Sequence, residues 1–140
     1  MRVLFDTSAI VKRYKREPGR SEVERLLGAA DSVVLAAHCR VEVAAALSRE
    51  LHDHEIDVLQ LSGALTAVAQ DFADFEVLAL NAQVEAFAIS AMQLSRLRAM
   101  DAIHIGTAQA AAVDMFITAD REQATAARRT GLNTELIASA

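Results

Sequence analysis

The sequence predicts an α/β fold in which a mostly parallel central sheet of four to five strands is flanked by helices. Short apolar runs such as residues 3–5 are typical of buried strands, and they alternate with longer segments of helical periodicity. The helical connections are long enough for right-handed crossovers between parallel strands. No repeat, linker or second composition interrupts the chain, so we expect a single domain over residues 1–140.

The same patterns place the individual elements. Strands are expected at residues 3–5, 32–36, 75–80 and 114–118, with one more short strand at 132–137. Helices are expected at residues 9–15, 21–30, 39–53, 55–72, 84–97, 101–112 and 120–130. Ser8 is the expected N-cap of the first helix, and Ser21 with Glu24 has the spacing of a capping box. Gly131 has the usual place just beyond the last helix.

The composition excludes several classes of protein. Hydrophobic residues make up 53% of the chain, which favours a globular core over disorder. The single cysteine, Cys39, has no partner for an internal disulfide, and we expect a small buried filler in a reducing compartment. Asp6 interrupts the first apolar run too early for a signal peptide, and no run approaches the roughly 20 residues of a membrane span. We expect a cytoplasmic protein with no membrane segment.

Four acidic residues have equivalent places in this pattern. Asp6 directly follows the first strand, Glu42 lies in the first turns after the second, and Asp120 comes two residues after the fourth. Asp101 opens the helix that leads into the fourth strand. Because the carboxyl ends of parallel strands share one edge, where open α/β sheets bind ligands, we expect these four side chains to converge there.

Each acid also has a purely structural alternative. Asp6, Asp101 and Asp120 are favourable N-caps at the positive end of a helix dipole. Glu42 is within reach of an ion pair with Arg40 or Arg49. For each residue alone, capping or pairing is as good an explanation as catalysis, and only the four together favour a shared site.

A divalent cation resolves the conflict of four neighbouring carboxylates. Without a cation, burial and mutual repulsion would raise their pKa values and neutralise them. Hard oxygen ligands suit Mg²⁺ or Mn²⁺, which keep positions open for water and a phosphate oxygen. Thr7, Ser8 and Thr118 are placed to hydrogen-bond the carboxylates or the waters around such an ion.

Other motifs add little chemistry. The histidines do not form a metal motif such as HExxH, and His104, three residues after Asp101, is expected to pack structurally. The net charge of −5 argues against a general nucleic-acid surface, yet basic residues gather locally. The candidates for RNA contact are Lys12, Arg13, Lys15, Arg16, Arg96 and Arg98. Solvated helix faces are the alternative explanation for each cluster.

Four stretches together resemble one protein family. They are VLFDTSAIVK near the N-terminus, Glu42 after the second strand, RLRAMDAIHIGTA at residues 96–108 and FITADRE at residues 116–122. In combination they resemble the PIN-domain ribonucleases, most closely the VapC toxins of bacterial toxin–antitoxin pairs. The resemblance covers essentially the whole chain and implies a PIN-like three-layer sandwich.

The resemblance implies an Mg²⁺- or Mn²⁺-dependent endoribonuclease. Asp6 and Asp101 would be the core metal ligands, and Asp120 would complete the site directly or through water. Glu42 would bind a second metal ion or orient the attacking water, and Thr118 matches a hydroxyl that often precedes the last acid. The resemblance also implies a homodimer inhibited by a small cognate antitoxin, which alone would contact operator DNA.

The resulting hypothesis is hydrolysis of RNA by in-line attack of a metal-activated water, with the basic residues holding the phosphate backbone. Few aromatic residues are present for base stacking. Two alternatives remain open: a catalytically silent PIN-like interaction module, and a receiver-like Mg²⁺-binding signalling domain. The second lacks a paired acid beside Asp6 and a lysine after the fourth strand. A phosphatase of the haloacid dehalogenase type would need an acid at the position of Ser8.

Overall fold

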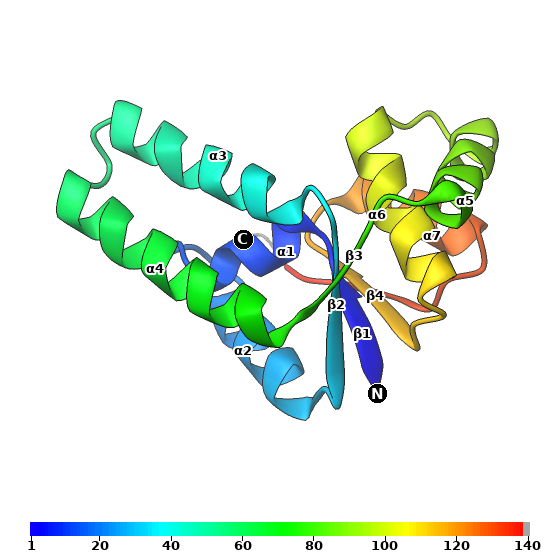
Figure 1. Cartoon of the computed structure of the whole chain (residues 1–140), viewed down its shortest axis with the longest axis horizontal. Coiled ribbons are helices and arrows are strands. Elements are labelled where there is room, and N and C mark those ends of the chain that lie inside the picture. Colours follow the sequence, from blue (N-terminus) through cyan, green and yellow to red (C-terminus); the bar gives the residue numbers. More distant parts are fainter. Residues whose placement is uncertain (139–140) are drawn as a thin grey trace.

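The computed structural model describes residues 1–138 and contains a five-stranded sheet in which every pairing is parallel (Figure 1). β1 (Arg2–Phe5) lies in the centre, between β2 (Ser32–Ala36) and β4 (Met115–Thr118). β3 (Glu76–Leu78) and β5 (Thr134–Leu136) form the two edges, so the strand order is β3-β2-β1-β4-β5. The predicted α/β class and parallel sheet are confirmed.

Helices cover both faces of the sheet, which confirms the three-layer sandwich. One layer consists of α1 (Thr7–Ile10), the short 3-10 helix η1 (Val11–Arg13), α2 (Arg20–Ala29), α3 (Cys39–His52) and α4 (Val58–Asp74). The other layer consists of α5 (Ala82–Leu94), α6 (Ala99–Ala110) and α7 (Arg121–Arg129). Figure 1 shows α3 and α4 as a pair that extends beyond the sheet on one side, with α5, α6 and α7 on the other.

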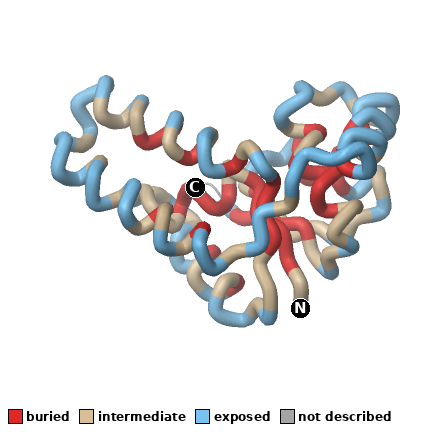
Figure 2. The backbone as a smooth tube through the Cα atoms, in the orientation of Figure 1, coloured by how far each residue is buried: buried red, intermediate tan, exposed pale blue. Residues whose placement is uncertain are grey.

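The alternation of side chains along β1 builds two separate cores. Val3 and Phe5 point to the face covered by α1 to α4, and Leu4 points to the face covered by α5 to α7. All three are fully or almost fully buried, as expected for a central parallel strand. Figure 2 shows the buried residues concentrated along the strands, while the outer turns of α3, α4 and α5 are exposed.

Close contact between α5 and α6 depends on one glycine. A Cβ built on Gly106 would lie 2.6 Å from the Val84 carbonyl oxygen and 2.8 Å from the Ala88 nitrogen. No side chain fits at that distance without moving one helix. This packing fixes the position of α6, the helix that carries Asp101.

Two predicted helix starts are wrong. Asp6, and not Ser8, is the N-cap of α1: its carboxylate accepts from the Ala9 nitrogen, because Ser8 turns its hydroxyl to Asp6 and β4 instead. α2 begins at Arg20 without a side-chain cap, since the chain enters it through Gly19 in a left-handed conformation.

Two further boundary differences arise because the helices begin at capping residues that the hydrophobic periodicity does not reveal. Asp57 forms a capping box with Gln60 and starts α4 three residues later than predicted. Asn81 caps α5 and starts it two residues earlier. Gly131 has a φ of +92° just beyond α7, as predicted.

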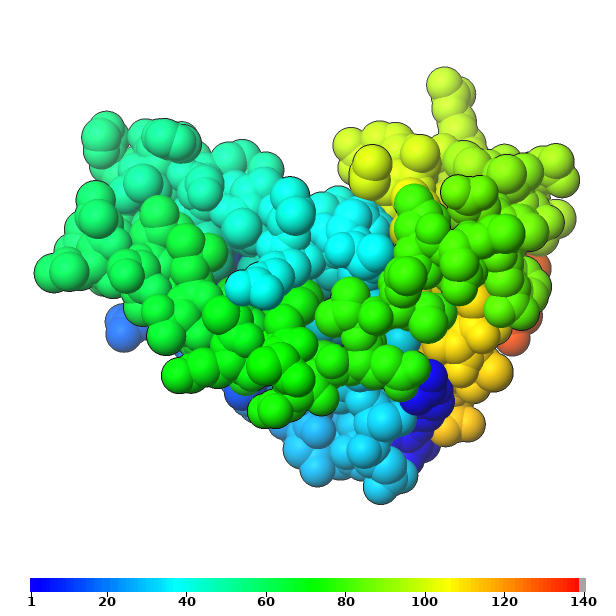
Figure 3. Space-filling view, viewed as in Figure 1, coloured from blue at the N-terminus to red at the C-terminus, as the bar shows by residue number. Residues whose placement is uncertain are grey.

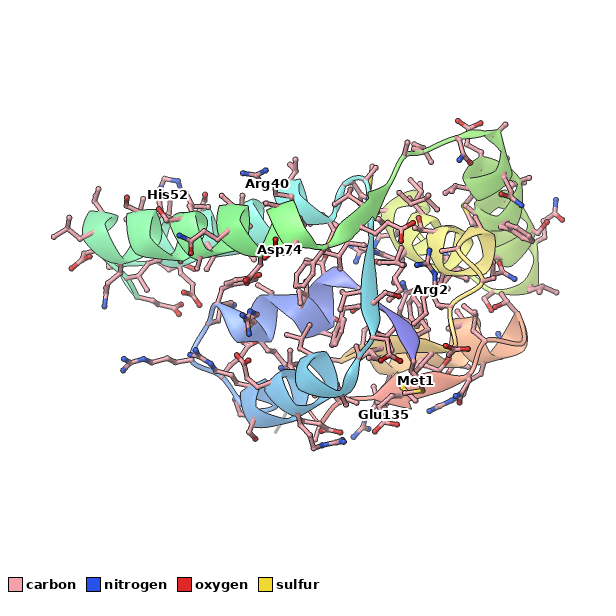
Figure 4. All side chains as sticks on the ribbon, turned by 60° about the horizontal axis from the view of Figure 1, so that its bottom comes forward. Met1, Arg2, Arg40, His52, Asp74 and Glu135 are labelled. Atoms are coloured by element: carbon pink, nitrogen blue, oxygen red, sulfur yellow. The ribbon has the colours of Figure 1, made fainter. Side chains whose placement is uncertain are left out.

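The amino ends of the strands are held by ion pairs. Arg2 reaches from β1 to Glu76 of β3, with Nη1 2.7 Å from Oε2, and its Nε donates to the Ala111 carbonyl (Figure 4). These contacts lie at the amino ends of the strands, whereas the four predicted acids lie at the carboxyl ends. Among residues 1–138, no helix has the length and apolarity needed to cross a bilayer.

Candidate functional site

A cleft of about 550 Å³ opens beyond the carboxyl ends of β1 and β4, between α1, α3 and the start of α6. Three of the predicted acids line it: Glu42, Asp101 and Asp120. Thr7 and Ser8 line it as well. Figure 3 shows the molecular surface hollowed between α3 and the segment around residue 100.

Asp6 lies beneath this cleft and is only 4% exposed. One carboxylate oxygen accepts from the Ser8 hydroxyl at 2.7 Å and from the Ala9 nitrogen at 3.1 Å. The other accepts from the Thr118 hydroxyl at 2.6 Å. Burial raises the pKa of Asp6, although nearby His104 and these hydrogen bonds oppose the rise. Among residues 1–138, no lysine or arginine pairs with this buried carboxylate, so a bound cation would stabilise its charged form.

The hydroxyl pair of Ser8 and Thr118 joins α1 to β4 directly above Asp6. Their oxygens lie 3.2 Å apart, and the Ser8 oxygen also accepts from the Ala119 nitrogen at 2.9 Å. Thr118 accepts in addition from the Asp120 nitrogen at 3.1 Å. The two side chains therefore orient Asp6 and the backbone that leads to Asp120.

Glu42 is held by side chains from α1, α6 and the start of α3. Its Oε1 accepts from the Thr7 hydroxyl and lies within hydrogen-bonding distance of His104 Nε2, both at 2.7 Å. His38 Nε2 lies 3.2 Å from the same oxygen. Burial alone would raise the pKa of Glu42, but the hydrogen bonds from His104, His38 and Thr7 lower it well below the usual range. Glu42 is thus ionised at neutral pH.

The ion pair predicted between Glu42 and Arg40 or Arg49 is absent from the described residues, because histidines take that place. Figure 4 shows Arg40 on the outer side of α3 with His52.

Asp101 and Asp120 sit at the starts of two helices. Asp101 lies in the first turn of α6, where Arg98 Nε is 3.4 Å from Oδ2 and Gln123 of α7 donates to its backbone oxygen. Asp120 is the N-cap of α7, and its Oδ1 accepts from the Glu122 and Gln123 nitrogens. The capping alternative is therefore correct for Asp120, although the residue still lines the cleft.

Each of the three predicted acids that line the cleft keeps one oxygen without a partner among residues 1–138. These oxygens are Oε2 of Glu42, Oδ1 of Asp101 and Oδ2 of Asp120. Asp6 differs, since both of its oxygens accept hydrogen bonds. The donor set consists of hard oxygens, which fits Mg²⁺ or Mn²⁺ better than a soft metal.

The described residues contain one tighter group of possible ligand atoms. Nitrogens of His38 and His104 and an oxygen of Glu42 all lie within 4.8 Å of one another, whereas the four acids do not form such a group. The sequence did not indicate this arrangement, since the spacing of the histidines matches no metal motif.

Comparison with known proteins identifies the family. A family model described as "PIN domain" matches residues 3–129. The chain belongs to the PIN-domain family. No curated protein sequence matches it.

Solved PIN-type structures resemble this chain at low sequence identity. FitAcB from Neisseria gonorrhoeae aligns with a TM-score of 0.74 at 18% identity, over 94% of this chain and 95% of that chain. VapBC2 from Rickettsia felis, bound to a promoter DNA fragment, aligns with 0.72 at 14% over 99% and 100%. VapC20 from Mycobacterium tuberculosis, a sarcin-ricin loop cleaving toxin, aligns with 0.68 at 16% over 89% and 94%. At these identities the similarity establishes the fold.

Two of the side chains predicted to contact RNA make hydrogen bonds and ion pairs within this PIN domain. Lys12 is 4% exposed, and its ammonium group donates to Glu17 and to the Pro18 carbonyl. Arg13 is turned away from the cleft, toward Glu24 and Asp71. Both side chains are occupied inside the protein, because the chain folds back after η1 and brings acceptors to them.

The other basic residues line three hollows. Lys15 and Arg98 line the acidic cleft, and Arg96 lines a hollow shared with Asp101 and Asp120. Arg16 lies apart, in a hollow between η1 and the α3–α4 pair. Arg49 lines the cleft and has no carboxylate within 4.0 Å among residues 1–138. Sequence reasoning missed it as a basic cleft residue, although seven positions after Glu42 is the same face of a helix.

Proposed function

We propose that this PIN-domain protein is a divalent-metal-dependent endoribonuclease. The observation that supports the proposal most strongly is the cleft itself: three carboxylates with free oxygens surround it, and a fourth lies buried beneath. Negative charge so concentrated suits a site that takes up a cation and, through it, a phosphodiester. Mg²⁺ and Mn²⁺ are the ions that match this donor set.

In the proposed site, Asp6 and Asp101 are the core ligands. Asp120 completes the set directly or through water, and Glu42 holds a second ion or orients the attacking water. A bound divalent ion would lower the pKa of its water and stabilise charge on the phosphoryl oxygens. Thr118 and Ser8 orient Asp6, and Thr7 orients Glu42.

Positive side chains at the rim would hold the RNA backbone. Arg49, Arg96 and Arg98 are exposed and line the cleft or the adjoining hollow. Lys15 also lines the cleft, but its side chain is only 22% exposed and is paired with Glu17 and Glu50. Arg98 faces Asp101 at 3.4 Å but is 88% exposed. The three arginines are therefore the proposed phosphate contacts, and recognition relies on backbone charge, since no aromatic residue lines the cleft.

We further propose a place in a toxin–antitoxin pair of the VapC type. Its support is the overall likeness to a toxin-antitoxin complex from Klebsiella pneumoniae and to VapBC and FitAB proteins, several of them solved with DNA. The proposed partners are a small antitoxin, a second copy of this chain, and operator DNA through the antitoxin. Two observations would test this part: growth arrest on induction of the gene, and its relief by co-expression of a neighbouring short reading frame, if the genome holds one.

Cleavage of RNA by the purified protein tests the nuclease proposal. After removal of metal with EDTA, we expect cleavage of total cellular RNA only when Mg²⁺ or Mn²⁺ is restored. Asp101→Asn should lower the rate by about 100-fold, which corresponds to roughly 3 kcal/mol of transition-state stabilisation. Glu85→Gln is the matched control, because Glu85 is an exposed acid on α5 outside the cleft.

Two results would contradict the proposal. Cleavage that persists in EDTA would exclude metal dependence. Equal rates for the native protein and Asp101→Asn would remove the cleft from the reaction and point to a contaminating nuclease. If neither result is obtained, sequencing the ends of cellular RNA after induction would identify the RNA that the protein cleaves.

A further inference from the structure

His104 is a deeply buried polar side chain that contacts a proposed site acid from a distant element. It is 2% exposed, lies on α6 one turn after Asp101, and reaches across to Glu42 of α3. Its Nε2 is 2.7 Å from Glu42 Oε1 and 3.2 Å from the Thr7 hydroxyl. A buried imidazole facing a carboxylate at this distance is a hydrogen-bond donor to it.

The neighbouring His38 indicates that this group is a hydrogen-bond network. His38 Nε2 faces two acceptors, the Met100 carbonyl oxygen at 2.9 Å and Glu42 Oε1 at 3.2 Å. A nitrogen between two acceptors carries a proton and has no lone pair free for a metal. The Nδ1 atoms of both histidines are buried without partners among residues 1–138, so within this part of the chain neither ring has the outer hydrogen bond that metal-bound histidines generally make.

We propose that His104 is a positioning residue that holds Glu42 in the orientation its role requires. This inference rests on the proposed nuclease function and adds a residue to it. α6 therefore positions two acids. It carries Asp101 in its first turn, and one turn later it carries His104, whose imidazole holds Glu42. Together with Thr7, His104 fixes Glu42 Oε1 and leaves Oε2 without a partner among residues 1–138.

Two substitutions at one position test the proposal. His104→Gln keeps an N–H donor near the place of Nε2, and His104→Leu keeps the bulk but removes the donor. Removal of a hydrogen bond to a charged acceptor should lower single-turnover cleavage by about 10- to 100-fold in His104→Leu. His104→Gln should stay within about threefold of the native rate. Urea unfolding of both variants shows that each is folded at the assay temperature.

A second background isolates the connection to Glu42. In Glu42→Gln protein, the further change His104→Leu should cost no additional activity, because the group it positions is already altered. Additive losses in the double variant would overturn the proposal. Equal losses in His104→Gln and His104→Leu would also overturn it, since the loss would then not follow the donor.

Metal binding provides a readout that does not depend on cleavage. Mn²⁺ affinity measured by calorimetry should fall in His104→Leu and be retained in His104→Gln, even if the protein fails to cleave RNA. Such a result would support the positioning role while the proposed function fails. Co²⁺ bound by imidazole, seen as visible absorption that His38→Ala removes, would instead show a histidine metal site and overturn the proposal.

Discussion

Replacement of Asp6 by Asn separates the cost of burying its charge from its value as a metal ligand. The amide keeps the oxygen that accepts from the Ala9 nitrogen, and Asn is as good an N-cap as Asp. What the variant loses is the negative charge, which burial makes unfavourable. In the absence of metal, we therefore expect Asp6→Asn to be more stable than the native protein at neutral pH.

The pH window follows from the direction of the pKa shift. The pKa of Asp6 is raised above its ordinary 3.8, so the folded protein holds this proton more tightly than the unfolded chain. The native protein therefore loses stability relative to the variant as the pH rises from about 4 through the folded-state pKa. At pH 8 in EDTA the variant should therefore unfold at a higher urea concentration than the native protein, and this difference should shrink as the pH falls toward 4.

Metal should reverse this order. At free Mn²⁺ one hundred times above Kd, the native protein gains about 2.7 kcal/mol, whereas the variant gains little. Urea unfolding at pH 8, with EDTA and with Mn²⁺, measures both effects. Asp120→Asn is the matched control, because Asp120 is also an N-cap but is exposed, and it should be neutral in EDTA. Equal stabilisation of native protein and Asp6→Asn by Mn²⁺ would refute the reasoning.

Three further predictions concern the scaffold. Gly106→Ala should cost about 1–3 kcal/mol in urea unfolding, because its Cβ would meet the backbone of α5, whereas Gly63→Ala, with open space around it, should gain about 0.5–1 kcal/mol. Tyr14→Phe should cost about 1–2 kcal/mol by the same measurement, since it removes the 2.6 Å hydrogen bond to Asp71. Burial raises the pKa of the Cys39 thiol to about 12, so an alkylating reagent at pH 8 should label it only as fast as the protein unfolds.

The fold was predictable because its signals are local. Val3, Leu4 and Phe5 form a continuous apolar run, and because successive side chains of a strand point to opposite faces, such a run is divided between two cores. The places of Asp6 and Asp120 after their strands then follow from the shared carboxyl edge of a parallel sheet. Three of the four predicted acids do line one cleft, and the fourth lies directly beneath it.

What the sequence did not predict depends on partners distant along the chain. His104 was interpreted as a packing residue, because its partner Glu42 lies 62 positions away and no motif relates them. Lys12 was counted as an RNA contact, because a run of basic residues does not reveal that Pro18 will turn its carbonyl to the ammonium group. In each case the local sequence identified the type of residue but did not indicate which distant group its side chain contacts.

Asp6 shows that helix capping and metal binding are not mutually exclusive roles for one carboxylate. Its first oxygen caps α1, and its second accepts from a hydroxyl 112 positions away, so the cap bond fixes the carboxylate at the sheet edge. Asp120 is similar, since its cap bonds use Oδ1 alone and leave Oδ2 without a partner among residues 1–138. A carboxylate held by a helix N-terminus loses rotamer freedom before any ligand arrives, and this reduces the entropy that binding must offset. We therefore expect the capping bonds of both residues to persist in the metal-bound protein.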